Sequence, residues 1–270
     1  MKPFVKEDSI VREIWGKSDT ILFVFAGASA EFALNKAVDW LYFTGKLPSD
    51  PLGRLFTTVG YARKIVFSPE ADALRAIDSL RKIHSGVENS RGFSIPDWAY
   101  RDVLFMLIHY SIAAYELLER KLNDEEKQEI FNVFYRLGDR MGLKELPSSY
   151  EEWLIARNQH MKHDLERSSY TSDLLNQYKK HLGTMRFNVL IEAQKLVVPP
   201  IVKELLHFSS YSFLKPVVPV YKITRYFKVD WLLKDILLPH AYKSQIEALN
   251  IVPQQKQLRC PFHFKTQIVS

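Results

Sequence analysis

The feature that most restricts the fold of this chain is a set of helix start and stop signals, with residues at helical spacing between them. Ser68, Pro69 and Glu70 have the order of an N-cap, a first-turn proline and a first-turn acid. Gly86 is placed to end the helix. Between these signals, residues repeat at spacings of four, three and four: Ala73, Ile77, Leu80 and His84. This stripe predicts an amphipathic helix over residues 68–85.

The rest of the chain carries the same kind of signal. Asn123 and Glu126 have the spacing of a capping box, and Gly142 follows the apolar stripe after them. The run 21–25 fits a short strand or a buried helix. Because only 10 of the 270 residues are glycine, turn-dense β architectures are disfavoured. We predict an all-α fold, a single multi-helix domain of about eight to ten helices. The further helices are expected over residues 28–43, 51–66, 102–120, 150–167 and 172–196.

The composition is typical of a folded, water-soluble protein. Hydrophobic residues make up 47% and charged residues 25%, so the chain can bury enough apolar surface to offset its ordering entropy. Cys260 is the only cysteine, which excludes an internal disulfide and cysteine-rich metal sites. The first residues are charged throughout, and no apolar run approaches the ~20 residues of a spanning helix. We expect a cytoplasmic protein with no signal peptide or transmembrane helix, either free or associated with a membrane surface.

The C-terminal third is basic and interrupted by prolines. Residues 179–270 carry 14 Lys and Arg against 5 Asp and Glu, and the prolines predict short helices. Large apolar residues interleave with the charges, so no nucleic acid partner is expected. The region is either a solvated basic face or a peripheral membrane contact. The residues that would make such a contact include Lys215, Lys222, Arg225, Lys228 and Trp231.

Sequence motifs exclude several enzyme classes. The chain has no G-x-G-x-x-G or P-loop for nucleotides, no G-x-S-x-G nucleophile elbow and no H-E-x-x-H zinc helix. His160 and His163 have a spacing that can place two metal ligands on one helix face. Their segment is highly polar, however, and we expect a solvated helix face there. A di-metal carboxylate oxygenase is disfavoured because no second Glu/His element accompanies this one.

Two polar side chains in predicted helices are the main candidates for chemistry. His84 lies on the apolar face of its helix, where it is either a hydrogen-bonded core histidine or a neutral imidazole able to hold haem iron. Arg54 shares a helix face with Thr58 and Tyr61. If Arg54 points inward it needs a carboxylate, a propionate or a polar substrate as partner. Otherwise it is a surface arginine or part of an internal salt bridge.

A second polar stripe runs through the apolar segment 28–43. Glu31, Asn35 and Asp39 repeat at spacings of four. The stripe either faces solvent or lines a polar pocket. In the second case, Glu31 or Asp39 supplies the partner of Arg54.

At these residues the sequence resembles a known family. Residues 50–61 read D-P-L-G-R-L-F-T-T-V-G-Y, and residues 83–87 read I-H-S-G-V. In order and spacing they are similar to the signature of the MpaB/rubber oxygenase (latex-clearing protein-like) catalytic domain family. The elements at 107–109 and 122–126 continue the resemblance, which covers most of residues 15–165.

The resemblance implies a globin-like core and an oxygenase that depends on haem b. His84 matches the histidine that holds the haem iron, so it is the expected metal ligand. Arg54 and Thr58 match groups on the other side of the pocket, where dioxygen and a hydrophobic small-molecule substrate would meet. Arg54, Thr58 and Asp39, the last as a pocket carboxylate, are therefore the expected catalytic residues. Thr57 stands where the family has a basic residue, so rubber-like cleavage is not expected. The expected cofactor-binding residues are His84, Arg54 and Thr57.

Two functions from different classes therefore fit the sequence. The first is a haem b-dependent oxygenase acting on an apolar or lipid-like small molecule. The second is a non-catalytic helical binding protein for haem or a hydrophobic ligand, peripheral to a membrane. We expect residues 1–270 to form one domain, with 15–165 as the family-like core and 179–270 packed on it or on a membrane. His109 is expected to be a buried hydrogen-bonding residue, and the sequence sets no oligomeric state.

Overall fold

Helices make up nearly all of the regular structure in the computed structural model, which describes residues 2–43, 45, 49–226 and 248–249. Within these residues, the extended pairings are isolated bridges, Pro3 with Pro69 and Asn35 with Leu165. The all-α prediction is confirmed, and the globin-like core stays a prediction. None of the described helices has the length and apolar character needed to cross a membrane.

In chain order the helices are α1 (Ile10–Gly16), α2 (Ser18–Phe32), the 3-10 turn η1 (Lys36–Val38), α3 (Asp39–Phe43), α5 (Pro51–Phe67), α6 (Glu70–Arg91), α7 (Asp97–Leu118), α8 (Asp124–Met141), α9 (Tyr150–His163), α10 (Ser169–Val197), α11 (Pro200–Leu205) and α12 (Val217–Tyr226).

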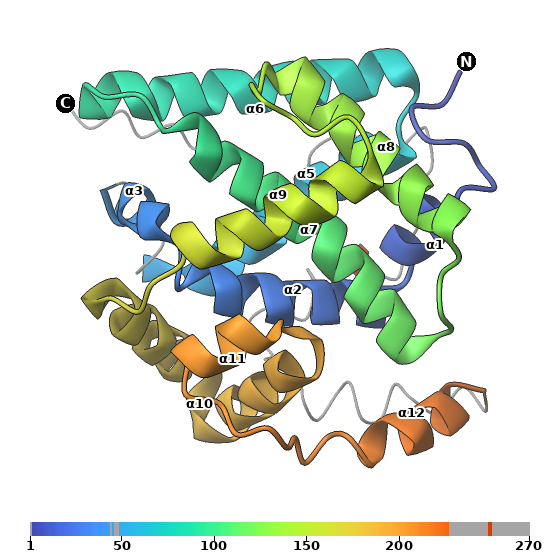
Figure 1. Cartoon of the computed structure of the whole chain (residues 1–270), viewed down its shortest axis with the longest axis vertical. Coiled ribbons are helices and arrows are strands. Elements are labelled where there is room, and N and C mark those ends of the chain that lie inside the picture. The colour runs from blue at the N-terminus through green and yellow to red at the C-terminus, as the bar shows by residue number, and fades with distance from the viewer. Residues whose placement is uncertain (1, 44, 46–48, 227–247, 250–270) are drawn as a thin grey trace.

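Two apolar helices, α2 and α7, form the centre of the fold (Figure 1). They pack closely because Gly27 of α2 has no side chain and the ring of Tyr110 of α7 occupies that space. α10 packs on α2, and α8 packs on α7. The antiparallel neighbours α5 and α6 pack against each other on another side of this core. The run 21–25 is therefore part of a buried helix rather than a strand.

Several predicted helix ends agree with the structure and others do not. The capping box of Asn123 and Glu126 is present at the start of α8, and Gly142 ends that helix at φ 81°. Gly86 does not end α6, because the helix continues to Gly92, which adopts the left-handed conformation at φ 78°. The predicted helix 28–43 is wrong: α2 ends at Phe32 and two shorter turns follow.

The described part of the C-terminal third packs on the core. Gln194 of α10 donates to Ser29 of α2 at 3.1 Å. Arg225 of α12 forms ion pairs with Asp19 at 3.0 Å and with Glu119 at 2.6 Å. α10 is broken at Gly183, where φ is 73° and ψ is 163°. Lys228 and Trp231 of the expected membrane contact, like Cys260, lie outside the described residues.

Candidate functional site

The start of α5 explains why the motif D-P-L-G precedes Arg54. Asp50 is the N-cap, and its carboxylate accepts a hydrogen bond from the Gly53 backbone N–H at 2.8 Å. Pro51 begins the helix, where its missing N–H costs nothing. A Cβ at Gly53 would meet the Asp50 carboxylate, so glycine lets this carboxylate lie directly over the first turn of the helix. The motif therefore fixes the backbone from which the Arg54 side chain extends.

Arg54 of α5 and His84 of α6 lie near each other across the two packed helices, close enough for the guanidinium to act on the imidazole. Burial, and then the nearby Arg54 guanidinium, lower the pKa of His84, so the imidazole is neutral at pH 7. Burial also lowers the pKa of Arg54. No carboxylate of the described residues forms an ion pair with Arg54. The structure thus brings together the two side chains that the sequence singled out.

The His84 ring is held by its neighbours on α6 and α7. Tyr100 packs edge-on against it, with ring centroids 5.2 Å apart, and the Tyr100 hydroxyl donates to Glu88 at 3.2 Å. Nδ1 of His84 is buried beside the Leu80 carbonyl one helical turn back, and makes no hydrogen bond of normal geometry within the described residues. A small rotation would let Nδ1–H donate to that carbonyl, which would leave Nε2 as a free lone pair.

The two threonines of the motif are occupied by their own helix. Thr57 donates to the Gly53 carbonyl at 2.8 Å, and Thr58 donates to the Arg54 carbonyl at 3.1 Å. Thr57 is partly buried, whereas Thr58 is exposed. Each hydroxyl therefore keeps its lone pairs for accepting a hydrogen bond.

The stripe Glu31, Asn35 and Asp39 does not supply a partner for Arg54. Asp39 pairs with Arg91 of α6 at 2.7 Å. Glu31 is fully buried and forms a bidentate ion pair with Arg157 of α9. The prediction of a Glu31 or Asp39 partner for Arg54 is therefore wrong, because other guanidiniums are already bound to both acids.

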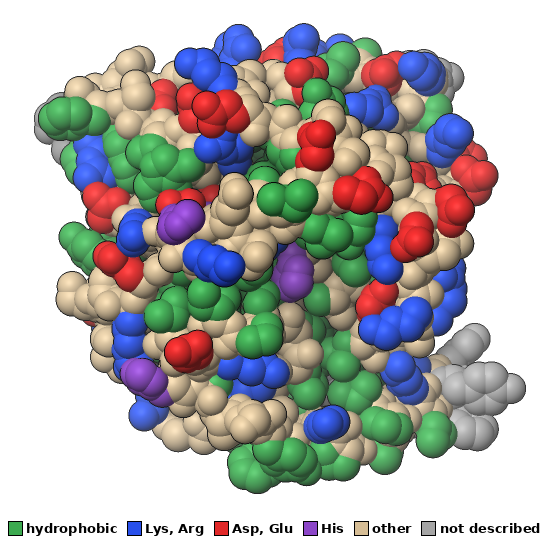
Figure 2. All heavy atoms as spheres, viewed as in Figure 1, with side chains coloured by type: hydrophobic (Ala, Val, Ile, Leu, Met, Phe, Trp, Pro, Cys, Tyr) green, Lys and Arg blue, Asp and Glu red, His purple; other side chains and the backbone are tan. Residues whose placement is uncertain are grey.

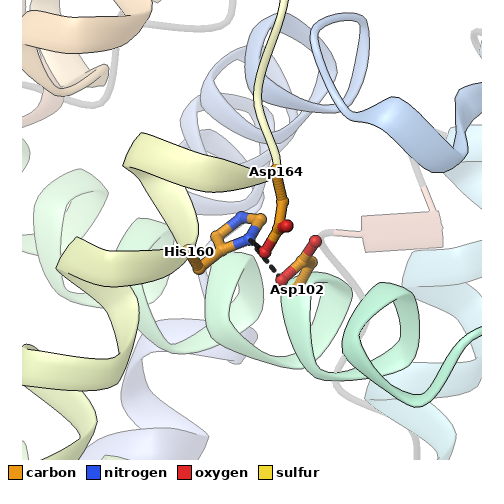
Figure 3. A group of neighbouring side chains, drawn as sticks. All are labelled: Asp102, His160 and Asp164. Carbon is orange, nitrogen blue, oxygen red and sulfur yellow. Dashed lines mark hydrogen bonds and ion pairs between the residues drawn. The ribbon is translucent and has the colours of Figure 1, made fainter.

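Glu31 belongs to a group of charges that the sequence did not predict, which we call the buried ionic cluster: Glu31, Asp102, Arg157, His160 and Asp164. Three of its members are drawn in Figure 3, where Nδ1 of His160 points at both Asp102 and Asp164. Asp164 lies at 3.0 Å, and Asn35 donates to the second oxygen of Asp102 at 2.8 Å. His160 is thus buried at 5% exposure, and the expected solvated face is wrong for it. His163, one turn later, is exposed.

The charges of this cluster compensate one another. Burial alone would raise the pKa of Glu31, but the Arg157 guanidinium holds it far below its usual range. Burial alone would lower the pKa of His160, but its contact with Asp102 and the nearby carboxylates of Glu31 and Asp164 raise the pKa to about 9. The cation at the centre of the two aspartates is therefore the protonated imidazole itself. The ligand atoms of Asp102, His160 and Asp164 also lie within 4.8 Å of one another, a spacing that a divalent ion can use in place of that proton.

His109 of α7 lies next to this cluster and is kept neutral. Burial and the charge of Arg157 lower its pKa to about 4, and it lies beside the Val197 carbonyl. Its ring packs edge-on against Tyr110, with centroids 4.9 Å apart. It packs between α7 and α10, but its Nε2 makes no hydrogen bond within the described residues, so the hydrogen-bonding role expected for it stays a prediction.

An apolar cavity of about 280 Å³ lies on the other side of α5 from Arg54. Apolar side chains from α2, α5, α10 and α12 form most of its wall, among them Phe23, Leu55, Leu190 and Val218. The polar side chains of the lining are Asp19, Ser29, Arg186 and Tyr221. His84, Arg54 and Thr58 are absent from this lining. The apolar cavity is therefore separate from the pair of His84 and Arg54, and α5 lies between them.

Comparison with known proteins identifies the family. Residues 15–227 match the family described as ER-bound oxygenase mpaB/B'/Rubber oxygenase, catalytic domain. The chain belongs to this family. The match extends well past residue 165, where we expected the resemblance to end, and takes in α10 to α12. No curated protein matches the chain. An oxygenase family of this kind acts on a small molecule with dioxygen, and the α5–α6 motif and the apolar cavity both lie within the matched residues.

Proposed function

We propose that this protein is a haem b-dependent oxygenase of apolar small molecules, with His84 as the iron ligand. The observation that carries the proposal is the facing pair of a neutral imidazole on α6 and a guanidinium on α5 that has no carboxylate partner within the described residues. Membership of an oxygenase family supports the reaction class.

The residues at this place fit a haem. An iron ligand needs one free ring nitrogen and a second one oriented by a hydrogen bond, and the position of Nδ1 beside the Leu80 carbonyl provides for both. Haem also carries two propionate carboxylates, and Arg54 is a guanidinium in need of such a partner. Bound haem would supply the iron at which dioxygen is activated.

The other side chains would set the geometry and polarity of the site. Tyr100 fixes the plane of the His84 imidazole by its edge-on contact. Thr57 and Thr58 donate to their own helix, so they can accept hydrogen bonds but cannot replace a cationic donor. Asp39 is held by Arg91 and can act on a substrate only through its remaining oxygen. Arg54 is therefore the principal hydrogen-bond donor that the motif offers to bound oxygen or to a propionate.

The test is the absorption spectrum of protein purified from cells supplied with iron and a haem precursor. We expect a Soret band and one iron per chain, with loss of the band in His84→Ala. The matched control is His163→Ala, which removes an exposed histidine and should leave the band unchanged. Arg54→Met should weaken haemin uptake without abolishing it. Colourless protein that also rejects added haemin would refute the proposal.

The separate apolar cavity favours a second candidate, a non-catalytic binding protein for a hydrophobic ligand. The cavity exists without any contribution from His84 or Arg54. In this case apolar ligands would bind, no Soret band would form, and His84→Ala would leave ligand binding intact. Iron without porphyrin would point instead to a non-haem centre, for which Asp102, His160 and Asp164 have the spacing.

A further inference from the structure

Among the described residues that line the apolar cavity, one charged side chain has a buried donor atom without a partner. Arg186 of α10 is part of the lining, and its Nε is buried with no hydrogen-bond partner within the described residues. A guanidinium donor removed from water without an acceptor is costly, so such a group favours an anion supplied from outside. The neighbouring lining is apolar, with Leu182, Val189 and Leu190 on the same helix.

The other charge in the lining is already compensated. The carboxylate of Asp19 is bound by Arg225 at 3.0 Å and accepts from the Tyr221 hydroxyl at 3.3 Å. Asp19 is therefore neither a partner for Arg186 within the fold nor a free anion that would repel a ligand. Within the described part of the lining, the charge available to an incoming molecule is therefore the guanidinium of Arg186.

The backbone adds to the positive potential at Arg186. The helix breaks at Gly183, so Arg186 lies in the first turn of the second segment of α10. A helix N-terminus carries a partial positive charge and favours anions. This contribution only adds to that of the side chain, which lines the cavity and carries a full charge.

α12 forms the outer wall and suggests how a ligand would enter. Val218 and Tyr221 line the cavity, whereas Val220 and Ile223 on the opposite face are exposed at 57% and 58%. Figure 2 shows hydrophobic side chains gathered along the lower edge of the molecule, over the chain that leads into α12 in Figure 1. An amphipathic molecule can therefore meet apolar surface on both faces of this short helix.

We infer that the cavity binds a single-chain amphipath with an anionic carboxylate head, its apolar chain within the cavity and its carboxylate on Arg186. The cavity volume of about 280 Å³ suits one extended chain better than a multi-chain lipid. Because α5 separates the cavity from His84, the inference concerns a second binding site and names no substrate of the proposed oxygenase. As a statement about a binding site, it stands on the cavity and Arg186 alone.

The test is calorimetric titration of the full chain with dodecanoate and with dodecanol, at pH 8 and below the micellar concentration. A charge-assisted hydrogen bond at a partly exposed site should make dodecanoate bind about tenfold more tightly than dodecanol. Arg186→Met should remove this preference while dodecanol still binds. The matched control is Lys180→Met, which removes an exposed cation of the same helix and should preserve the preference.

A second variant locates the ligand. Ala193→Trp places a large side chain in the cavity lining and should weaken both ligands, and Ala193→Leu serves if the larger residue prevents folding. Equal binding of the two ligands, no binding of either, or a preference that survives Arg186→Met would overturn the inference. Binding that is unchanged in both Ala193 variants would do the same.

The outcome is separable from that of the proposed function. If the protein shows a Soret band that depends on His84 but no preference for dodecanoate, only the carboxylate site is refuted and the oxygenase proposal stands. If the protein prefers dodecanoate but never takes up haemin, the oxygenase proposal is refuted and the carboxylate site stands.

Discussion

The buried pair of Glu31 and Arg157 should contribute more to stability than any exposed ion pair of this protein. The two side chains are 0% and 3% exposed, and they join α2 to α9 through two parallel hydrogen bonds. Removing one member of a buried pair costs about 3–5 kcal/mol, because the other charge stays buried without its partner. In Arg157→Met, Glu31 would keep the Tyr110 hydroxyl at 2.7 Å and His160 Nε2 at 3.8 Å. We therefore expect a loss near the lower end, about 3 kcal/mol.

The assay is equilibrium unfolding in urea followed by tryptophan fluorescence, since Trp153 on the same helix is 1% exposed. The matched control is Arg140→Met, which removes an exposed bidentate partner of Asp78 and should cost less than about 1 kcal/mol. The double variant Glu31→Gln/Arg157→Met should lose less than the sum of the single losses, because it leaves no unpaired charge. If Arg157→Met costs no more than Arg140→Met, or if the two single losses simply add, the reasoning is wrong.

Three further predictions concern two glycines in helices, the protonation of His160 and the cap of α8. Gly27→Ala should destabilise the protein by about 1–3 kcal/mol, because the new Cβ collides with the Tyr110 ring. Gly86→Ala should stabilise the protein by about 0.5–1 kcal/mol, because its Cβ would lie in open space within α6. Urea unfolding of both variants should show changes of opposite sign in the free energy of unfolding. The pKa of His160 is raised from 6.5 to about 9, so its contribution of about 3 kcal/mol should be fully present below pH 6.5 and be lost as the pH rises through 9. Unfolding free energies measured from pH 6 to pH 9.5 should therefore fall in wild type more steeply than in His160→Gln, and parallel curves would contradict this. Asn123→Ala should cost about 1 kcal/mol, because it removes the bond that the Asn123 side chain accepts from the Glu126 backbone N–H, and a lower thermal midpoint is the readout.

Local signals in the sequence predicted local structure well. Asp50 with Pro51 starts α5, and Asn123 with Glu126 starts α8, because each cap is satisfied by residues within one turn. The break after Phe32 was not predictable in this way. There the Glu166 backbone donates to the Leu34 carbonyl at 2.8 Å and the Lys36 backbone to the Asp164 carbonyl at 3.0 Å, so a distant segment ends the helix.

In the candidate site, too, the residues that carry a local sequence pattern were predicted and the others were not. His84 and Arg54 were predicted because a motif in α5 and a stripe in α6 mark them. The buried ionic cluster was missed because its members are contributed by α2, α7 and α9, and pairing between distant charges leaves no local pattern. One signal was present: Arg157, His160 and Asp164 lie at spacings of three and four, which places three ionisable groups on one face of α9.

α5 is the element that joins the two spaces of this protein. Arg54 extends from one face toward His84, and Leu52, Leu55 and Phe56 extend from another face into the lining of the apolar cavity. The Asp50 cap and Gly53 fix the start of this helix for both faces. A ligand in the cavity would therefore contact the same helical turn that carries Arg54 on its other face.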